Sequence, residues 1–380
     1  MDKRTCAVVN LGAIRSNLRQ VRWWIGAGPK IMAVVKANAY GHGIETVSRA
    51  LADAGADYLA VASTDEARRI REFGVSRPIL VFGNPDPLCI RDYFTLDLEV
   101  SVSDYETARF VSDEAIRAGR KPDVHLKIDT GMGRYGLMQR ELERELPKIA
   151  ALPGIRLKGL WSHFPNADDA SPDFTISQIR RFQDCLEIAD RLKVEVELKH
   201  VANSAATLYY PDAHFDMVRP GLLLYGYAPQ GLINAPIILT PALSLISHVS
   251  LVKRIAAGTP VSYGSSWKSS AETDLAVVPI GYADGVTRAV SNRLKVVING
   301  KRYPQVGNVT MDNIMVNLGL NHDVKKMDEV VIFGEQMVTA ADVARWSNTI
   351  PWEVLCGITG RVPRVYTDKE PAIVQPVLEK

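Results

Sequence analysis

The feature that most constrains the fold of this chain is a rhythm of short apolar runs, each followed by a segment with helical periodicity, through residues 31–218. A short continuous apolar run is typical of a strand that is buried on both faces of a parallel sheet. Eight such strands with helices between most of them predict an α/β fold of the (β/α)8 TIM-barrel type. The predicted strands are Ile31–Val35, Tyr58–Ala62, Pro78–Phe82, Leu98–Val102, Val124–Ile128, Leu157–Trp161, Leu198–Val201 and Phe215–Val218.

Two of the helical segments are clearly amphipathic. Residues 11–24 repeat apolar side chains at helical spacing and follow Asn10, a residue type that favours the N-cap position. Residues 174–192 repeat the same kind of pattern over a longer stretch. Both segments are therefore expected to pack one face against the strands.

The pattern changes near Gly231–Pro236, after which helices nearly vanish and strand-like runs bounded by Gly, Asn and Asp dominate. We expect a (β/α)8 barrel over residues 1–235, although its first residues can join the second domain, and a mainly-β domain over residues 236–380. One short helix is expected around Ala340–Trp346, and Asn299-Gly300 is a hairpin-turn signal. The expected β runs are Ser247–Ile255, Leu275–Gly281, Leu294–Ile298, Ile314–Leu318 and Val330–Phe333.

Composition excludes several classes of partner. The 380 residues include 45 Lys and Arg against 43 Asp and Glu, a formal charge of +2, and the basic residues do not cluster, so neither nucleic acid nor an acidic membrane surface is expected. No apolar stretch has the length of a membrane span or a signal-peptide core. The cysteines lie far apart, which favours reduced thiols, and no metal site is expected. The sequence predicts a soluble cytoplasmic protein.

Lys36 is the strongest chemical signal, because it directly follows the predicted strand Ile31–Val35. Catalytic residues of TIM barrels lie at the carboxyl ends of the strands. An ammonium group beside apolar walls has a lowered pKa, which makes its amine available for covalent bonding to a carbonyl carbon. Taken alone, a strand-end lysine is more often a surface residue whose charged end reaches solvent.

Two glycine-containing segments predict an anion site near the same end of the barrel. Tyr40–Gly43 leads into an expected helix, and Met217–Gly226 closes the eighth βα unit, where barrel enzymes frequently bind phosphate. Arg219 and Gly221 lie in the second segment. A salt-bridged loop arginine and a simple turn glycine are the competing interpretations of these two residues.

Arg134 is a candidate for holding a substrate carboxylate. It lies in a glycine-rich turn after the strand that ends at Asp129, and a guanidinium binds a carboxylate through two parallel hydrogen bonds. Lys127, inside the same predicted strand, is anomalous because a lysine is costly to bury.

Together these segments bring out a likeness to a known family. The string Ala33–Gly43 closely resembles the pyridoxal-phosphate signature of alanine racemases, and further segments resemble that family in its own order over nearly the whole chain. The resemblance implies interconversion of L-alanine and D-alanine, which supplies D-alanine for peptidoglycan. The further segments are Leu126–Gly136, Gly159–Phe164, Val201–Ser204, Val218–Gly221, Val261–Gly264, Gly281–Gly285, Val306–Asp312 and Arg361–Tyr366.

The resemblance also implies a cofactor and two bases. Lys36 would carry pyridoxal 5′-phosphate in the barrel, and Tyr263 would arrive from the β domain of the partner subunit, so that a homodimer shares its active sites. Racemisation needs a base on each face of the α carbon, and lysine and tyrosine supply two bases of different pKa. By the same resemblance, Lys36 serves the D face and Tyr263 the L face.

The other implied contacts surround the cofactor and the substrate. Arg219 would face the pyridine nitrogen, and because a guanidinium does not accept a proton, that nitrogen would stay unprotonated. The remaining implied residues are His163, which fixes Arg219; Tyr40, Ser204, Tyr366 and the backbone amides of Gly221 and Leu222 at the phosphate; Arg134 and the Met311 amide at the substrate carboxylate; Lys127 as a carbamate that orients Arg134; and Asp312 as a supporting acid.

Alternatives of three kinds stay open. A serine racemase or a broader-specificity racemase is one, because Asn308, Thr310 and Pro165-Asn166 depart from the common family pattern near the expected substrate corridor. A pyridoxal-phosphate decarboxylase of similar plan is another, although its cofactor nitrogen should face an acid rather than Arg219. A single-barrel carrier of pyridoxal phosphate is the third, and it would lack residues 240–380.

Overall fold

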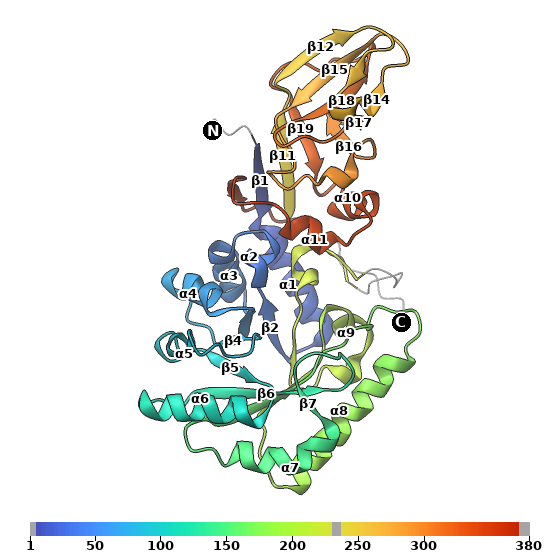
Figure 1. Ribbon diagram of the computed structural model, residues 1–380. Coiled ribbons are helices and arrows are strands. Elements are labelled where there is room, and N and C mark those ends of the chain that lie inside the picture. Colours follow the sequence, from blue (N-terminus) through green and yellow to red (C-terminus); the bar gives the residue numbers. More distant parts are fainter. Residues whose placement is uncertain (1–4, 230–236, 372–380) are drawn as a thin grey trace. The chain divides into compact units, whose positions relative to one another are not determined.

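The structure is a computed structural model that describes residues 5–229 and 237–371, and these residues form two compact units (Figure 1). The barrel unit is built mainly from Ile14–Ala39 and Ile44–Leu239. The β unit is built from Met1–Ala13, Tyr40–Gly43 and Thr240–Pro371. The change of pattern expected at Gly231–Pro236 lies outside the described residues.

The barrel unit holds parallel strands in the order β10-β2-β3-β4-β5-β6-β8-β9, which confirms the predicted (β/α)8 arrangement. Single backbone hydrogen bonds, from Asp216 N to Lys199 O at 3.1 Å and from Arg219 N to Ala202 O at 2.9 Å, bring β9 and β10 together and nearly close the barrel. The strands are β2 (Lys30–Val34), β3 (Tyr58–Val61), β4 (Ile79–Val81), β5 (Glu99–Val102), β6 (Asp123–Asp129), β8 (Arg156–Trp161), β9 (Leu198–His200) and β10 (Met217–Val218), with β7 (Leu137–Met138) paired to β6.

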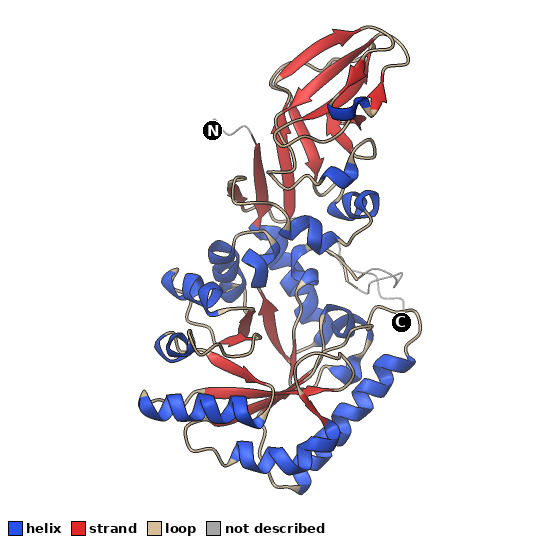
Figure 2. Ribbon diagram, in the orientation of Figure 1, coloured by secondary structure: helices blue, strands red, loops and turns tan. Residues whose placement is uncertain are grey.

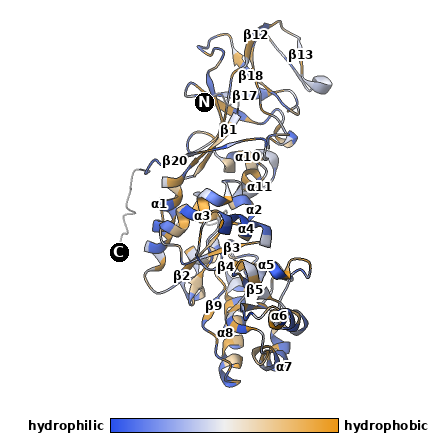
Figure 3. Cartoon of the chain, turned by 90° about the vertical axis from the view of Figure 1, so that its left-hand side faces the viewer, coloured by the Kyte–Doolittle hydropathy of each residue, from blue (hydrophilic) through white to orange (hydrophobic). Residues whose placement is uncertain are grey.

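Helices surround the barrel strands (Figure 2), and hydrophobic and hydrophilic residues mix along them, as an amphipathic element requires (Figure 3). Asn10 caps α1 as predicted, because its Oδ1 accepts from Gly12 N at 3.1 Å and Ala13 N at 3.4 Å. The helices are α1 (Leu11–Ile25), α3 (Ile44–Asp53), α4 (Thr64–Glu72), α5 (Ile90–Thr95), α6 (Tyr105–Arg117), α7 (Gln139–Ala150), α8 (Asp173–Arg191) and α9 (Ser204–Tyr209).

The short turn α2 (Lys36–Tyr40) that follows β2 is left-handed, a feature that the sequence analysis did not predict. Ala37, Asn38 and Ala39 have φ of 53°, 55° and 53°, a conformation that costs a non-glycine residue roughly 1–2 kcal/mol. Neighbouring elements hold the turn in place. Glu66 of α4 accepts from Ala37 N at 2.6 Å, and Asn38 Oδ1 accepts from the backbone of α3.

In the β unit the strand order is β12-β15-β18-β17-β16-β19-β11-β1-β20. Strand β1 (Thr5–Asn10) pairs with β11 on one side and with β20 on the other. The predicted single run Ser247–Ile255 was wrong, because it spans the end of β11 (Leu243–His248) and the whole of a second strand, β12 (Leu251–Ile255). Between them Val249 N bonds to Asp328 O and Ser250 N to Val277 O, so the chain changes its neighbouring strand there.

The other predicted β runs are strands, and Asn299-Gly300 turns between β16 and β17 with φ of 49° and 73°, as expected for a type I′ hairpin. The short helix α10 (Ala340–Ser347) is present, and a second one, α11 (Pro351–Cys356), was not expected. Within the described residues, no helix is both long and apolar enough to cross a membrane. The remaining strands are β13 (Pro260–Val261), β14 (Trp267–Lys268), β15 (Thr273–Val278), β16 (Lys295–Ile298), β17 (Lys301–Val306), β18 (Ile314–Gly319), β19 (Glu329–Phe333) and β20 (Arg364–Thr367).

Candidate active site

Four cationic side chains lie around His163, three of them after the carboxyl ends of barrel strands and one within β6. His163 follows β8, and its burial, together with the charges of the four cations, holds the pKa of its imidazole well below the ordinary value of 6.5. The imidazole is therefore neutral at pH 7. The cations are Arg219, Arg134, Lys127 and Lys36.

Lys127 lies in β6 with only 4% of its surface exposed, and its Nζ is 4.4 Å from the centre of the Trp161 ring. Burial and then the charges of Arg134 and Arg219 lower the pKa of Lys127 to about 8, against the opposing effect of Asp129. A lysine amine with this pKa is partly unprotonated near neutral pH, and only the unprotonated amine can act as a nucleophile.

The turn that carries Arg134 is fixed by one carboxylate. Asp129 Oδ1 accepts from the backbone N–H groups of Gly131, Met132 and Gly133 at 2.9, 2.8 and 3.2 Å. This wrapping holds the glycine-rich segment against the end of β6, and it leaves the Arg134 side chain exposed. The turn therefore presents a guanidinium at the edge of the cation cluster.

Arg219 is buried, with 3% of its surface exposed, and its described partners are neutral acceptors. Its Nη1 bonds to His200 Nδ1 at 3.1 Å, and its Nη2 bonds to His163 Nδ1 at 3.2 Å and to the carbonyls of Ser162 and Val201 at 2.7 and 3.1 Å. Burial lowers the pKa of Arg219 to about 9, which still leaves the guanidinium charged at pH 7. Its Nε–H donates to none of the described residues.

An anion cradle adjoins Arg219 along the chain. The N–H of Gly221 donates to Ser204 Oγ at 3.0 Å, and Ser204 opens α9, whose cap is the side chain of Asn203. Leu222 follows Gly221 at the start of a short 3-10 turn. Hydroxyl and backbone N–H groups in such a turn are suited to phosphate oxygens.

The barrel-unit residues fit pyridoxal phosphate. The amine of Lys36 matches the carbonyl carbon of the cofactor. Arg219, a buried cation with one N–H that no described residue accepts, matches the ring nitrogen. The hydroxyl of Ser204 and the nearby backbone amides match the phosphate. The sequence-predicted residues of this unit, which are Lys36, Lys127, Arg134, His163, Ser204, Arg219, Gly221 and Leu222, all lie at or after the carboxyl ends of barrel strands, except Lys127, which lies within β6.

In the β unit, Tyr40 and Tyr366 belong to two segments that pack closely together. A Cβ at Gly43 would lie 1.9 Å from Tyr366 Oη, and Arg364 Nε donates to Gly41 O at 2.9 Å. Burial raises the pKa of Tyr40 well above its ordinary value of 10, so the phenol stays protonated and can donate a hydrogen bond.

Tyr263 stands on a short turn of the β unit and is 75% exposed. Asn308 holds this turn, because its Nδ2 donates to Tyr263 O at 2.7 Å while Ser262 Oγ donates to Asn308 O at 2.7 Å. Asn308, which departs from the common family pattern, therefore supports the backbone of Tyr263, the predicted base.

Met311 and Asp312 also lie in the β unit. The carbonyl of Met311 accepts from Ala283 N at 3.1 Å, and Asp312 Oδ1 accepts from Arg361 Nη2 at 2.9 Å. Arg361 also pairs with Asp284, at 3.3 Å. Asp312 is thus held by Arg361, which belongs to Arg361–Tyr366, the last of the segments that resemble the family.

The sequence analysis missed His200, which bonds directly to Arg219. A signal was present in the sequence, because His200 lies one residue before the end of the predicted strand Leu198–Val201, and it is the last residue of β9. It also missed Trp161, whose ring lies 5.2 Å from the Arg219 guanidinium carbon and stacks on His200.

Comparison with known proteins agrees with this geometry. The family model described as the alanine racemase N-terminal domain matches residues 9–229, and that of the alanine racemase C-terminal domain matches residues 242–366. Alanine racemase 2 of Caldanaerobacter subterraneus subsp. tengcongensis is 41% identical over 362 residues, which cover 94% of this chain and 93% of that protein.

Solved structures give the same answer. Alanine racemase of Clostridium difficile 630 superposes with a TM-score of 0.94 at 36% identity, covering 98% of each chain. Alanine racemase of Bartonella henselae, solved with covalently bound pyridoxal phosphate, superposes with a TM-score of 0.87 at 28% identity, covering 96% of this chain and 100% of that one. The match of both domain models also sets aside a single-barrel carrier. With both units matched along nearly its whole length, the chain belongs to the alanine racemase family of isomerases.

Proposed function

We propose that this protein interconverts L-alanine and D-alanine with pyridoxal 5′-phosphate held at Lys36, and that it supplies D-alanine for peptidoglycan. The single observation that carries the proposal is the set of cations around His163. Positive groups gathered in this way repel one another, and anionic ligands would relieve that repulsion. A cofactor phosphate and an amino-acid carboxylate are such anions.

Pyridoxal phosphate, when bound, supplies an electron-withdrawing ring that acidifies the C–H bond at the α carbon of an attached amino acid. Lys36 Nζ would then move a proton on the D face, and Tyr263 Oη of the partner subunit would move one on the L face. Arg219 would donate to the ring nitrogen and, as a cation that does not release its proton, would leave that nitrogen unprotonated.

The resemblance assigns the remaining binding roles. Tyr40, Tyr366, Ser204 and the amides of Gly221 and Leu222 would bind the phosphate, and His163 would steady Arg219. Arg134 and the Met311 amide would bind the substrate carboxylate, with Asp312 in support.

Lys127 would act as a carbamate. Its unprotonated amine would add to carbon dioxide with loss of one proton, which turns a buried cation into an acceptor for Arg134. The lowered pKa of Lys127, about 8, supports this step because it makes the amine available near neutral pH.

The expected assembly rests on the same family resemblance. We infer a cytoplasmic homodimer in which residues 1–235 supply the barrel, the first of them joining the β domain, and residues 236–380 supply the β domain with Tyr263. The shared site accounts for a catalytic tyrosine that stands exposed on its own chain.

Lys36→Ala tests the function. The variant should lose the cofactor absorbance and at least about a thousandfold of racemisation while its circular dichroism stays that of the parent, because Lys36 tethers the cofactor at a strand end without supporting the core. Lys30→Ala, at the opposite end of the same strand and largely exposed, is the matched control and should keep both signals. Unchanged absorbance and activity in Lys36→Ala would overturn the assignment.

A further inference from the structure

A column of polar side chains runs through the interior of the barrel, where branched apolar side chains are the usual filling. It begins at Glu99, the first residue of β5, passes His125 in β6 and His200 at the end of β9, and reaches Arg219 after β10. The two histidines are fully buried, and Glu99 is 7% exposed. Polar groups in such a place are costly unless each is hydrogen-bonded.

The hydrogen bonds of the column run in one direction. Arg219 has only donors, so His200 Nδ1, 3.1 Å away, must accept. A neutral His200 then carries its proton on Nε2 and donates to His125 Nδ1 at 2.9 Å. His125 in turn carries its proton on Nε2 and donates to Glu99 Oε2 at 2.7 Å. Arg219, which only donates, and the Glu99 carboxylate, which only accepts, therefore favour the same tautomer of both imidazoles.

The same atoms exclude the reversed hydrogen bond, in which His125 would donate to His200. If His125 Nδ1 donated instead, His200 Nε2 would have to accept, and the Nδ1–H of a neutral His200 would point at the N–H of Arg219. Burial, with the charge of the nearby Arg219, holds the pKa of His200 well below 6.5, which agrees with a neutral ring.

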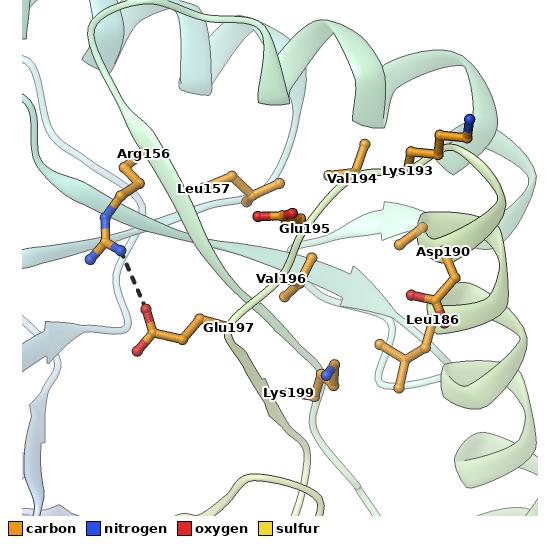
Figure 4. Close-up of a pocket in the computed structure, with 11 residues that line it drawn as sticks. Arg156, Leu157, Leu186, Asp190, Lys193, Val194, Glu195, Val196, Glu197 and Lys199 are labelled. Carbon is orange, nitrogen blue, oxygen red and sulfur yellow. Dashed lines mark hydrogen bonds and ion pairs between the residues drawn. The ribbon is translucent and has the colours of Figure 1, made fainter.

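At its other end the column reaches the amino-terminal face of the barrel. Lys158 Nζ bonds to Glu99 Oε1 at 2.5 Å and to Asp123 Oδ2 at 2.9 Å, and Arg156 bonds to Asp123 at 2.6 Å. Arg156 also pairs with Glu197 at 3.3 Å on the wall of a pocket of about 770 Å³ (Figure 4). Charges alternate along this row, so Glu99 is held ionised and both of its oxygens are used.

The backbone reserves room for His125. Gly159 of β8 lies opposite His125 in the sheet, and a Cβ there would lie 2.3 Å from His125 Nδ1. Trp161, two residues on, stacks on His200 at 5.9 Å with an angle of 9° between the rings. A glycine that clears one imidazole and an indole that supports the next are independent signs that both rings are held in place.

We propose that Glu99 and His125 are positioning residues, which act through His200 to keep an acceptor facing Arg219 and so hold the guanidinium in place for the reaction. The effect on catalysis rests on the proposed function, whereas the tautomer of His200 does not. Without the column, His200 can place a proton on Nδ1, and two donors would then face each other. Arg219 would turn away from the position where it meets the cofactor ring.

The decisive measurement is ¹⁵N NMR of histidine-labelled, cofactor-loaded protein without substrate, with each histidine signal assigned by a variant that removes it. In the parent, His200 and His125 should both carry their proton on Nε2 at pH 7. In His125→Leu the His200 signal should leave that tautomer, and kcat should fall at least about tenfold with KM little changed, because the interaction serves the chemical step.

Matched variants separate positioning from packing. In His125→Asn, the side-chain oxygen stands near the former Nδ1, so both the His200 tautomer and most of kcat should return. Gly159→Ala keeps every residue of the column and should act like His125→Leu, because it displaces the imidazole. His214→Leu removes a buried barrel histidine that bonds to Thr207 O instead, and it should leave the His200 signal and kcat unchanged.

A parent His200 protonated on Nδ1 would overturn the proposal, as would His125→Leu with an unchanged His200 signal. Equal losses of kcat and thermal stability in His125→Leu and His125→Asn, with no change of tautomer, would show a packing role alone and also overturn it. Expected tautomers in a protein that does not racemise alanine would leave the column as inferred and refute only the proposed function.

Discussion

Arg219 is a buried cation whose described partners are two imidazoles and two backbone carbonyls. Arg219→Glu would place a carboxylate there, which can hold a proton on the cofactor nitrogen and strengthen the ring as an electron sink. Racemisation should fall about a hundredfold, and slow pyruvate formation with a new long-wavelength absorbance should appear. A variant that keeps the cofactor, racemises at the parental rate and makes no pyruvate would show that Arg219 does not control that nitrogen.

The proposed mechanism gives Tyr263 the L face alone, so Tyr263→Phe should cause a one-sided loss. Exchange of the α hydrogen of L-alanine with deuterated solvent should fall about a hundredfold or more, and exchange of D-alanine should fall much less. Mass spectrometry of each enantiomer measures both rates. Tyr105→Phe, which removes a phenol from α6, should change neither. Equal losses from both enantiomers would contradict the two-base roles.

At the scale of elements, the sequence allowed the barrel to be predicted strand by strand, because buried parallel strands are continuous apolar runs whose ends are punctuated by polar residues. The same rule failed at Ser247–Ile255, where an unbroken run of strand-forming residues belongs to two strands with different neighbours. Pairing partners are set by tertiary contacts that a local pattern does not contain. The left-handed turn after β2 was missed for a related reason, since contacts from α3 and α4 maintain it.

The dependence on tertiary contacts also separates the site residues that the sequence reveals from those that it does not. Lys36 and Arg219 closely follow strands, and Arg134 lies in a glycine-rich turn after β6, so a chain pattern is enough to find them. Glu99 and His125 lie within strands, and the register between neighbouring strands decides which side chains meet inside the barrel. Ser101 pairs with His125, and His125 pairs with Gly159. A one-residue change in that register would turn each side chain to the other face.

The pair of strands β12 and β15 carries an ion pair that gives a pH-dependent prediction. Arg254 donates two hydrogen bonds of 2.9 Å to Asp274, and these, with a bond from His322, lower the carboxyl pKa from 3.8 to about 2. Because the folded pKa is the lower one, the stabilisation is present above pH 4 and is lost as the pH falls from 3.8 toward 2.

Asp274→Asn should therefore lower the free energy of unfolding by about 1 kcal/mol at pH 7, a discounted value because Arg254 is 57% exposed. The difference from the parent should shrink by roughly half at pH 3. Urea unfolding at both pH values measures it, and the same deficit at pH 7 and pH 3 would rule out this ion pair as the source.

At the scale of the whole molecule, the chain passes between its two units more than once. The β unit takes Met1–Ala13 and Tyr40–Gly43 as well as Thr240–Pro371. Strand β1 stands between β11 and β20, so a fragment that starts after the barrel would lack an interior strand of its own sheet. The β unit is therefore not expected to fold when cut from the rest of the chain.

Subunit mixing tests the inferred shared site. Lys36→Ala and Tyr263→Phe should each be inactive as homodimers, yet a mixed dimer pairs the intact lysine of one chain with the intact tyrosine of the other. Random exchange gives half mixed dimers, each with one working site of two, so activity should return to about a quarter of the parental value. Differently tagged chains verify the mixed dimer, and its complete inactivity would argue against sites built from two subunits.

The left-handed turn after Lys36 explains part of the sequence likeness between this chain and its family. At φ near 53° a β-branched side chain is sterically excluded, Ala is tolerated at a cost, and Asn is among the residues that enter this region most readily. Ala37, Asn38 and Ala39 are residues of those kinds. Part of the string that resembles a cofactor signature thus records the shape of the main chain rather than any contact with a ligand. A distant relative could keep that shape with other small residues or glycine, and a search by letters alone would then overlook it.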